Sequence, residues 1–179
     1  ERSTPAHGSL TARAYRAAHG LAGDARGAVI VQRLVVPRAA GVAFSTNPMT
    51  GADEVVVSAC LGLGEGVVAD AAPSVLYRIV GSTIVEATIA HKSTAVRVNA
   101  GAVAVDDAVA AAPALAAADV VALAAAVRDL AARAGRALDV EWVHDDDGLS
   151  FVQARPLTAL PTPLPTPPPT STRTPATTT

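Results

Sequence analysis

The first ninety residues alternate between hydrophobic and polar positions in short runs, which predicts strands joined by tight turns. The strands expected in this part of the chain are 28–35, 41–46, 54–60, 75–80 and 83–89. Asn47-Pro48-Met49-Thr50-Gly51 consists of turn-forming residues, and Gly81-Ser82 fits a two-residue hairpin turn. A glycine-rich loop covers 61–66, and Ser9 can cap a short helix that ends at His19.

The second half of the chain adds one amphipathic helix and one more hairpin. Asp119 can cap the helix and Gly135 can end it, because these residue types favour helix ends. The residues expected on the buried face of this helix are Val120, Leu123, Val127 and Leu130. Strands at 140–143 and 149–154 form the hairpin. Strands outnumber helices and their connections are short, so we expect an α+β fold with a mainly antiparallel sheet.

Composition excludes several classes of protein. Of 179 residues, 14 are Lys or Arg and 16 are Asp or Glu, so the net charge of −2 does not favour binding to nucleic acid or anionic membranes. One cysteine cannot supply a disulfide framework or a cysteine-rich zinc site. The mostly alanine stretch 108–127 contains Pro113 and Asp119, which argues against a membrane span. We expect a cytoplasmic protein without nucleic-acid or membrane partners.

The C-terminal end has a different composition from the rest of the chain. Of the 19 residues in 161–179, 7 are Pro and 8 are Thr, a mixture that cannot build a packed core. We therefore expect one domain over 1–158 and a Pro/Thr-rich disordered tail or linker over 159–179. A ligand for a proline-binding partner is a weaker alternative, because the segment offers only a bare PxxP pattern.

The last hairpin carries polar residues in an informative pattern. If Asp146-Asp147-Gly148 forms a three-residue loop, Glu141 lies opposite Gln153 and Asp139 lies opposite Arg155. All four side chains then share one face of the sheet. A carboxylate, an amide oxygen and a guanidinium on one face can hold a divalent cation together with a phosphate.

Two alternatives to this site stay open at the level of the sequence. The four polar side chains can simply form the solvated face of an amphipathic hairpin. A two-residue turn at Asp147-Gly148 would also move Gln153 to the opposite face from Glu141 and remove the site. The register of the hairpin therefore decides whether the site exists.

Five segments in a fixed order resemble one known family. These segments are Val31–Val35, Gly41–Gly51, Gly62–Glu65, Asp139–Trp142 and Gln153–Thr158. Together they resemble the ATP-grasp nucleotide-binding domain of the pyruvate phosphate dikinase group, which includes phosphoenolpyruvate synthase and the rifampicin phosphotransferases. The resemblance covers about residues 9–158 and implies a partial ATP-grasp fold.

The resemblance implies an ATP-dependent phosphotransferase whose nucleotide domain phosphorylates a histidine on a separate swivelling domain. Gln32 and Leu34 match the strand that borders the adenine. Glu141 and Gln153 match the pair that binds Mg²⁺ beside the phosphates. Arg155 matches the catalytic arginine that contacts the phosphates. The cofactors expected from the resemblance are therefore ATP and Mg²⁺.

The chain also departs from the family pattern. The upstream lysine, arginine and glycine-rich phosphate loop have no counterpart here, and no histidine-bearing domain follows Thr158. We therefore expect the C-terminal portion of a split or truncated enzyme that is inactive alone. Its partners would be the missing N-terminal half and a phosphohistidine carrier domain, in cis or in trans, together with a small-molecule acceptor that the sequence does not identify. The alternative is a non-catalytic remnant or assembly module with little or no nucleotide affinity.

Overall fold

The fold is seen in a computed structural model that describes residues 30–64 and 73–158, with the single positions 14, 17, 20 and 161. The chain divides into two compact units, Glu1–Leu34 and Val35–Thr179. The elements named below all belong to the second unit. Most of the predicted helix from Ser9 to His19 and nearly all of the predicted tail lie outside the described residues.

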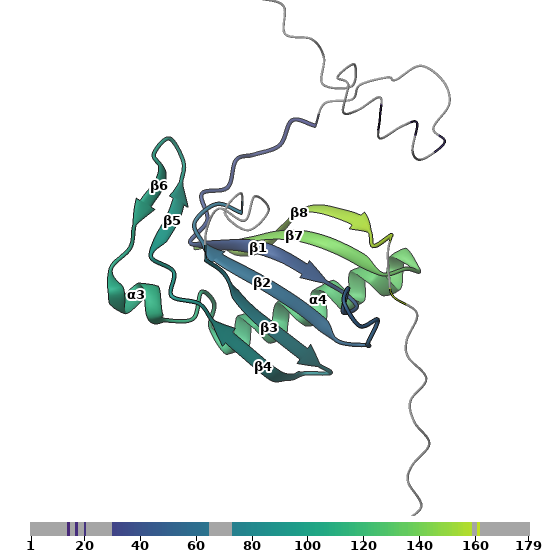
Figure 1. The fold of residues 1–179 in the computed structure, drawn as a ribbon. Helices are drawn as coiled ribbons and strands as arrows, with labels where there is room; N and C mark the ends of the chain where they lie inside the picture. The colour runs from purple at the N-terminus through teal and green to yellow at the C-terminus, as the bar shows by residue number, and fades with distance from the viewer. Residues whose placement is uncertain are drawn as a thin grey trace, which may run out of the picture. The chain divides into compact units, whose positions relative to one another are not determined.

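An antiparallel sheet forms the centre of the second unit (Figure 1). Its strands are β1 (Ala39–Phe44), β2 (Val55–Leu61), β3 (Val75–Val80), β4 (Thr83–Ile89), β7 (Leu138–Asp145) and β8 (Gly148–Pro156). They are arranged in the order β4-β3-β2-β1-β7-β8, and every neighbouring pair is antiparallel. The α+β class and the mainly antiparallel sheet expected from the sequence are confirmed.

Helix α4 (Ala117–Ala134) lies across one face of this sheet (Figure 1). The buried residues between the helix and the sheet include Val57, Tyr77, Val120, Leu123, Val127, Val140 and Trp142. Each large side chain removed from water in this way contributes about 1.5–3 kcal/mol to folding. No described helix combines the length and the apolar character that crossing a lipid bilayer requires.

The helix begins earlier than the sequence predicts. Ala116 is its N-cap, without a side-chain hydrogen bond, so the expected cap at Asp119 is wrong and this carboxylate lies in the first turn instead. There it faces the positive end of the helix dipole and lies 3.8 Å from the His144 imidazole. The predicted end is confirmed, because Gly135 adopts the left-handed conformation that closes many helices.

A smaller group of elements lies beside the main sheet. Strands β5 (Thr94–Arg97) and β6 (Gly101–Ala104) pair with each other, and the short helix α3 (Asp107–Ala111) follows them. Lys92, just before β5, is fully buried and donates from Nζ to the carbonyl oxygen of Ala110 at 2.9 Å. The sequence pattern did not predict these elements.

The strand predicted over 28–35 is not formed in the described part of this segment. Residues 30–37 are extended but belong to neither sheet. Ile30 and Val31, which the pattern placed in this strand, are 85% and 93% exposed. A strand is stable only when a neighbouring strand satisfies its backbone hydrogen bonds, and sequence pattern alone does not show whether that neighbour is present.

Candidate functional site

The β7–β8 hairpin brings the predicted pairs together. Glu141 lies opposite Gln153, and Asp139 lies opposite Arg155, as predicted. The expected three-residue loop is wrong, because Asp145 pairs with Gly148 and leaves a two-residue loop.

An irregularity in the hairpin compensates for the shorter loop by shifting the register of the strands. The pairing shifts by one residue next to Glu141, where Val152 on β8 has no partner on β7. The shift restores the pairs that the longer loop would have produced. The predicted polar face is therefore present, although the predicted length of the turn is wrong.

The candidate site lies on the face of the sheet that α4 does not cover. Val140 and Trp142 point to the helix and are buried there. Since neighbouring side chains on a strand alternate between faces, Asp139 and Glu141 point the other way. Arg155 Nε donates to Asp139 Oδ2 at 2.8 Å, an ion pair that is half exposed at Arg155 and buried at Asp139. This hydrogen bond raises the pKa of Arg155, and the Glu141 carboxylate acts in the same direction.

Asp139 has a second oxygen that the described residues leave unused. Its Oδ1 is buried and has no hydrogen-bond partner within the described ranges. A buried carboxylate oxygen of this kind is costly to leave unpaired, which suggests that a ligand, cation or water is accommodated there. The sequence placed Asp139 on this face but gave it no role, and its buried unpaired oxygen is visible only in three dimensions.

The donor set suits a hard cation. Glu141 and Asp139 offer carboxylate oxygens and Gln153 offers an amide oxygen, which are ligands that Mg²⁺ accepts. Among the described residues, no group of three or more His, Cys, Asp or Glu side chains is placed to hold a metal ion. A cation held by Glu141 and Gln153 would therefore need further oxygens from a bound ligand or water, as Mg²⁺ sites beside phosphates usually do.

The two residues expected to border adenine belong to a different compact unit from the hairpin residues. Gln32 and Leu34 belong to the first compact unit, whereas Glu141, Gln153 and Arg155 belong to the second. Both Gln32 and Leu34 are exposed, and Leu34 is 67% exposed. Their proposed contact with a nucleotide stays a prediction.

A second polar cluster was missed by the sequence analysis. Glu54 is buried, and its carboxylate accepts hydrogen bonds from Asn47 Nδ2 at 2.6 Å and from Arg78 NH2 at 2.9 Å. These bonds hold the pKa of Glu54 below its ordinary value, with Arg78 as the larger cause. Arg78 also donates to Glu86 on β4 at 2.5 Å. Arg78 and Glu86 are paired because the register shifts by one residue between Arg78 and Ile79. In the regular hairpin predicted from Gly81-Ser82, Arg78 would lie opposite Val85, so the local pattern gave no signal for this contact.

The cluster fixes the turn between β1 and β2. Asn47 Oδ1 accepts from the backbone N–H groups of Met49 and Thr50, at 2.8 and 3.2 Å. Through Asn47, Glu54 and Arg78, this turn is tied to the β3–β4 hairpin. The turn predicted at Asn47–Gly51 is confirmed, and its rigidity comes from contacts that are distant in sequence.

Comparison with known proteins finds relatives that are named as transferases and phosphoenolpyruvate synthases. A rifampicin phosphotransferase of Streptomyces sp. is 36% identical over 137 residues, which are 74% of this chain and 16% of the relative. A probable phosphoenolpyruvate synthase of Methanocaldococcus jannaschii is 35% identical over 140 residues, 74% of this chain and 12% of the relative. The prodigiosin synthesizing transferase PigC of Serratia marcescens is 36% identical over 138 residues, 73% of this chain and 16% of the relative.

The chain therefore spans only 12–16% of the length of these three relatives. The family described as pyruvate phosphate dikinase, AMP/ATP-binding domain, matches residues 7–173. This match includes the β7–β8 hairpin and the whole of the described sheet. The chain belongs to the pyruvate phosphate dikinase AMP/ATP-binding domain family.

Proposed function

We propose that this chain is the ATP- and Mg²⁺-binding portion of a dikinase-type phosphotransferase. The observation that carries the proposal is the polar face of the β7–β8 hairpin, on which Asp139, Glu141, Gln153 and Arg155 gather. Membership of an AMP/ATP-binding family supports the nucleotide, and relatives named as phosphotransferases and phosphoenolpyruvate synthases support the reaction class.

Each residue of the polar face has a separate role in this proposal. Glu141 and Gln153 would hold Mg²⁺ through a carboxylate and an amide oxygen. When bound, Mg²⁺ neutralises phosphate charge and fixes the geometry of the phosphates. Arg155 would bind phosphate oxygens with the nitrogens that Asp139 leaves free, since a guanidinium carries five N–H donors and the ion pair uses the one on Nε. Phosphoryl transfer needs mainly positioning and charge neutralisation, which these residues can supply.

In this proposal, the portion works together with two further parts of the enzyme. The sheet with α4 would be part of an ATP-grasp-like domain that ends near Thr158, in which Gln32 and Leu34 border the adenine. The missing half of that domain and a carrier domain with a phosphorylatable histidine would act with this chain, in cis or in trans. The phosphoryl group would then pass from the histidine to pyruvate or another small acceptor.

The proposal is tested by phosphate labelling of the complete protein. ATP labelled with ³²P at the β or the γ position is added in parallel reactions, with and without Mg²⁺. Acid-labile, base-stable label on histidine is expected in the presence of Mg²⁺, and Glu141→Ala should abolish it. A folded protein that binds no Mg²⁺-ATP and forms no phosphohistidine would instead support a non-catalytic assembly module.

A further inference from the structure

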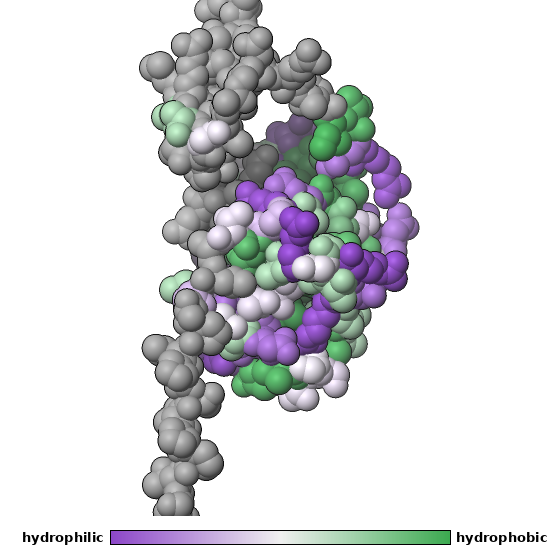
Figure 2. Space-filling view, turned by 90° about the vertical axis from the view of Figure 1, so that its right-hand side faces the viewer, coloured by the Kyte–Doolittle hydropathy of each residue, from purple (hydrophilic) through white to green (hydrophobic). Residues whose placement is uncertain are grey.

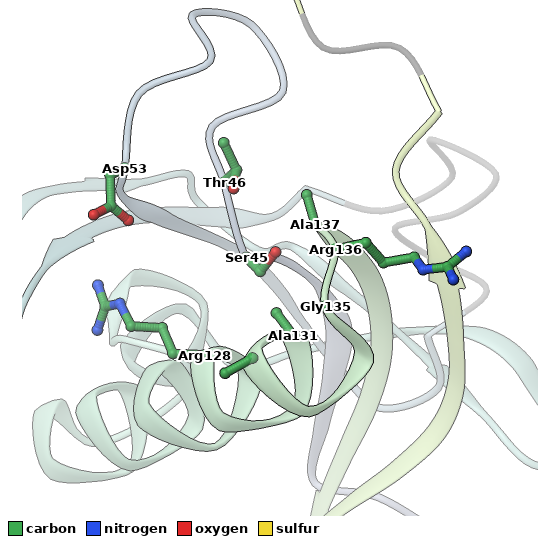
Figure 3. A pocket seen from close by; sticks show the side chains of 9 residues that line it. Ser45, Thr46, Asp53, Arg128, Ala131, Gly135, Arg136 and Ala137 are labelled. Carbon is green, nitrogen blue, oxygen red and sulfur yellow. The ribbon is translucent and has the colours of Figure 1, made fainter.

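A pocket of about 410 Å³ lies at the C-terminal end of α4 (Figure 3). It opens on the helix side of the sheet, whereas Glu141 and Gln153 belong to the opposite face. Ser45 and Asp53, at the two ends of the β1–β2 connection, line it together with Arg128 of α4. The surface at this end of the sheet, which faces the viewer in Figure 2, carries both hydrophilic and hydrophobic residues.

Two opposite charges line this pocket without neutralising each other. The side chains of Asp53 and Arg128 point toward one another in Figure 3. Nevertheless, Asp53 forms no hydrogen bond or ion pair with any residue in the described part of the chain. The carboxylate is exposed and available to a ligand.

Arg128 is held in place by the backbone of the β3–β4 hairpin. Its NH2 group donates to Ile79 O at 2.8 Å, and its NH1 group donates to Gly81 O. Each terminal nitrogen carries a second N–H, and Nε carries another, so three donors remain for an anionic group. A guanidinium already fixed in this way loses little conformational entropy when it binds a carboxylate.

Beside the two charged side chains, the pocket has a small, apolar floor (Figure 3). Ala131, Gly135 and Ala137 leave room above the end of the helix. Ser45 Oγ accepts from Leu138 N at 2.9 Å, so its own hydroxyl proton can still be donated. The pocket thus offers an anion-binding group and a cation-binding group that face each other, with an apolar surface beside them.

We propose that this pocket binds a small zwitterion of the amino-acid class. Its carboxylate would contact Arg128, its ammonium group would contact Asp53, and its carbon skeleton would lie on the alanine floor. A simple anion would be repelled by Asp53, and a simple cation would be repelled by Arg128. A molecule carrying both charges can pair with both groups, which makes this ligand class the best match to the pocket.

The proposal is tested by an NMR titration of the ¹⁵N-labelled 179-residue chain. L-alanine and 4-aminobutyrate are the zwitterionic probes, while propionate and propylamine carry one charge each. We expect saturable shifts of the Ala131 and Gly135 amide signals with at least one zwitterion. Binding of the singly charged compounds should be roughly tenfold weaker, because each loses one charge-assisted hydrogen bond.

A matched pair of variants separates the pocket from general effects of charge. Asp53→Asn should weaken zwitterion binding about tenfold, and it should fold normally because the Asp53 side chain has no partner to lose. Arg136→Gln serves as the control, since Arg136 lines the pocket but its guanidinium points away from it (Figure 3). Equal binding of propionate and the zwitterions, unchanged binding by Asp53→Asn, or the absence of saturable shifts would each overturn the proposal. Comparing the singly charged probes with the zwitterions tests the need for both charges in the unaltered protein, so this part of the test does not depend on the folding of any variant.

Discussion

Arg155 on β8 and Asp139 on β7 lie directly opposite each other, and 2.8 Å separates Nε from Oδ2. The Asp139 side chain is only 10% exposed, whereas that of Arg155 is 56% exposed. The carboxylate is thus fixed within the sheet and holds a guanidinium that reaches into solvent. The orientation of Arg155 depends on this one buried acid, which makes Asp139 a positioning residue.

Asp139→Asn should loosen Arg155 without changing the shape of the site. The substitution removes the charge that raises the pKa of Arg155 and weakens the hydrogen bond by about 1 kcal/mol. We expect hydrogen exchange of the Arg155 Nε–H, followed by NMR, to become roughly fivefold faster. Asp129→Asn is the control, because Asp129 pairs with Arg133 on α4 and should leave the Arg155 signal unchanged. Unaltered exchange in Asp139→Asn would show that the ion pair does not hold Arg155.

Two adjacent residues on β7 should respond in opposite ways to replacement by alanine. In the complete enzyme, Glu141→Ala should lower phosphoryl transfer by roughly two orders of magnitude or more, as removal of a group that stabilises the transition state does. Its effect on stability should be modest, since Glu141 is only partly buried and lies on the polar face. Trp142→Ala should lose about 3–5 kcal/mol, because this side chain is 1% exposed within the core.

The contrast is measured by urea unfolding of both variants together with labelling of the carrier histidine. Any loss of activity in Trp142→Ala should disappear under conditions that keep the variant folded. The activity of Glu141→Ala should stay low under the same conditions and should change its dependence on Mg²⁺ concentration. Full turnover by Glu141→Ala, with the original Mg²⁺ dependence, would remove Glu141 from the metal site.

The sequence predicted the polar face correctly for a partly incorrect reason. Residue types at Asp146-Asp147-Gly148 allow loops of either two or three residues, and the shorter loop is formed. The irregularity beside Glu141 compensates for the missing loop residue. Bulges depend on the packing of the whole strand, so a local pattern does not reveal them. The burial of Val140 and Trp142 against α4 is what fixes the face of Glu141.

Other features could not be predicted from local sequence, because they depend on contacts between distant parts of the chain. The segment that includes Val31 and Leu34 has the β-branched residues typical of a strand, but whether a neighbouring strand pairs with it cannot be predicted from this local pattern. The bond between Glu54 and Arg78 joins residues that are 24 positions apart. By contrast, the β3–β4 hairpin and the glycine cap of α4 depend on neighbouring residues, and both were predicted from them.

Gly41→Ala should destabilise the pairing of β1 with β2. A Cβ atom at this position would lie 1.9 Å from the carbonyl oxygen of Ser58, so the strands would have to move apart. We expect a loss of roughly 3 kcal/mol in the free energy of unfolding, measured with urea. Gly64→Ala is the matched control, because its Cβ would meet the nearest atom at an ordinary distance of 3.6 Å, and it should change stability by less than about 0.5 kcal/mol. Equal stability of the two variants would refute the steric argument.

Lys92 should make stability depend on pH in the alkaline range. Its ammonium group is fully buried, and desolvation holds its pKa below the ordinary value. Between the folded pKa and the higher unfolded pKa, the unfolded chain binds more protons, so raising the pH through this window favours the folded state. Below the folded pKa both states are protonated and this contribution is constant.

Lys92→Met isolates this effect, because it removes the titrating group and keeps a long side chain. Tyr77, whose pKa is raised by burial, titrates in both proteins and cancels in the comparison. Urea unfolding from pH 7 to pH 10 should show the wild-type protein gaining stability relative to Lys92→Met, with a slope of at most about 1.4 kcal/mol per pH unit. A constant difference, or one that shifts in favour of Lys92→Met as the pH rises, would mean that the buried ammonium group keeps its ordinary pKa in the folded protein.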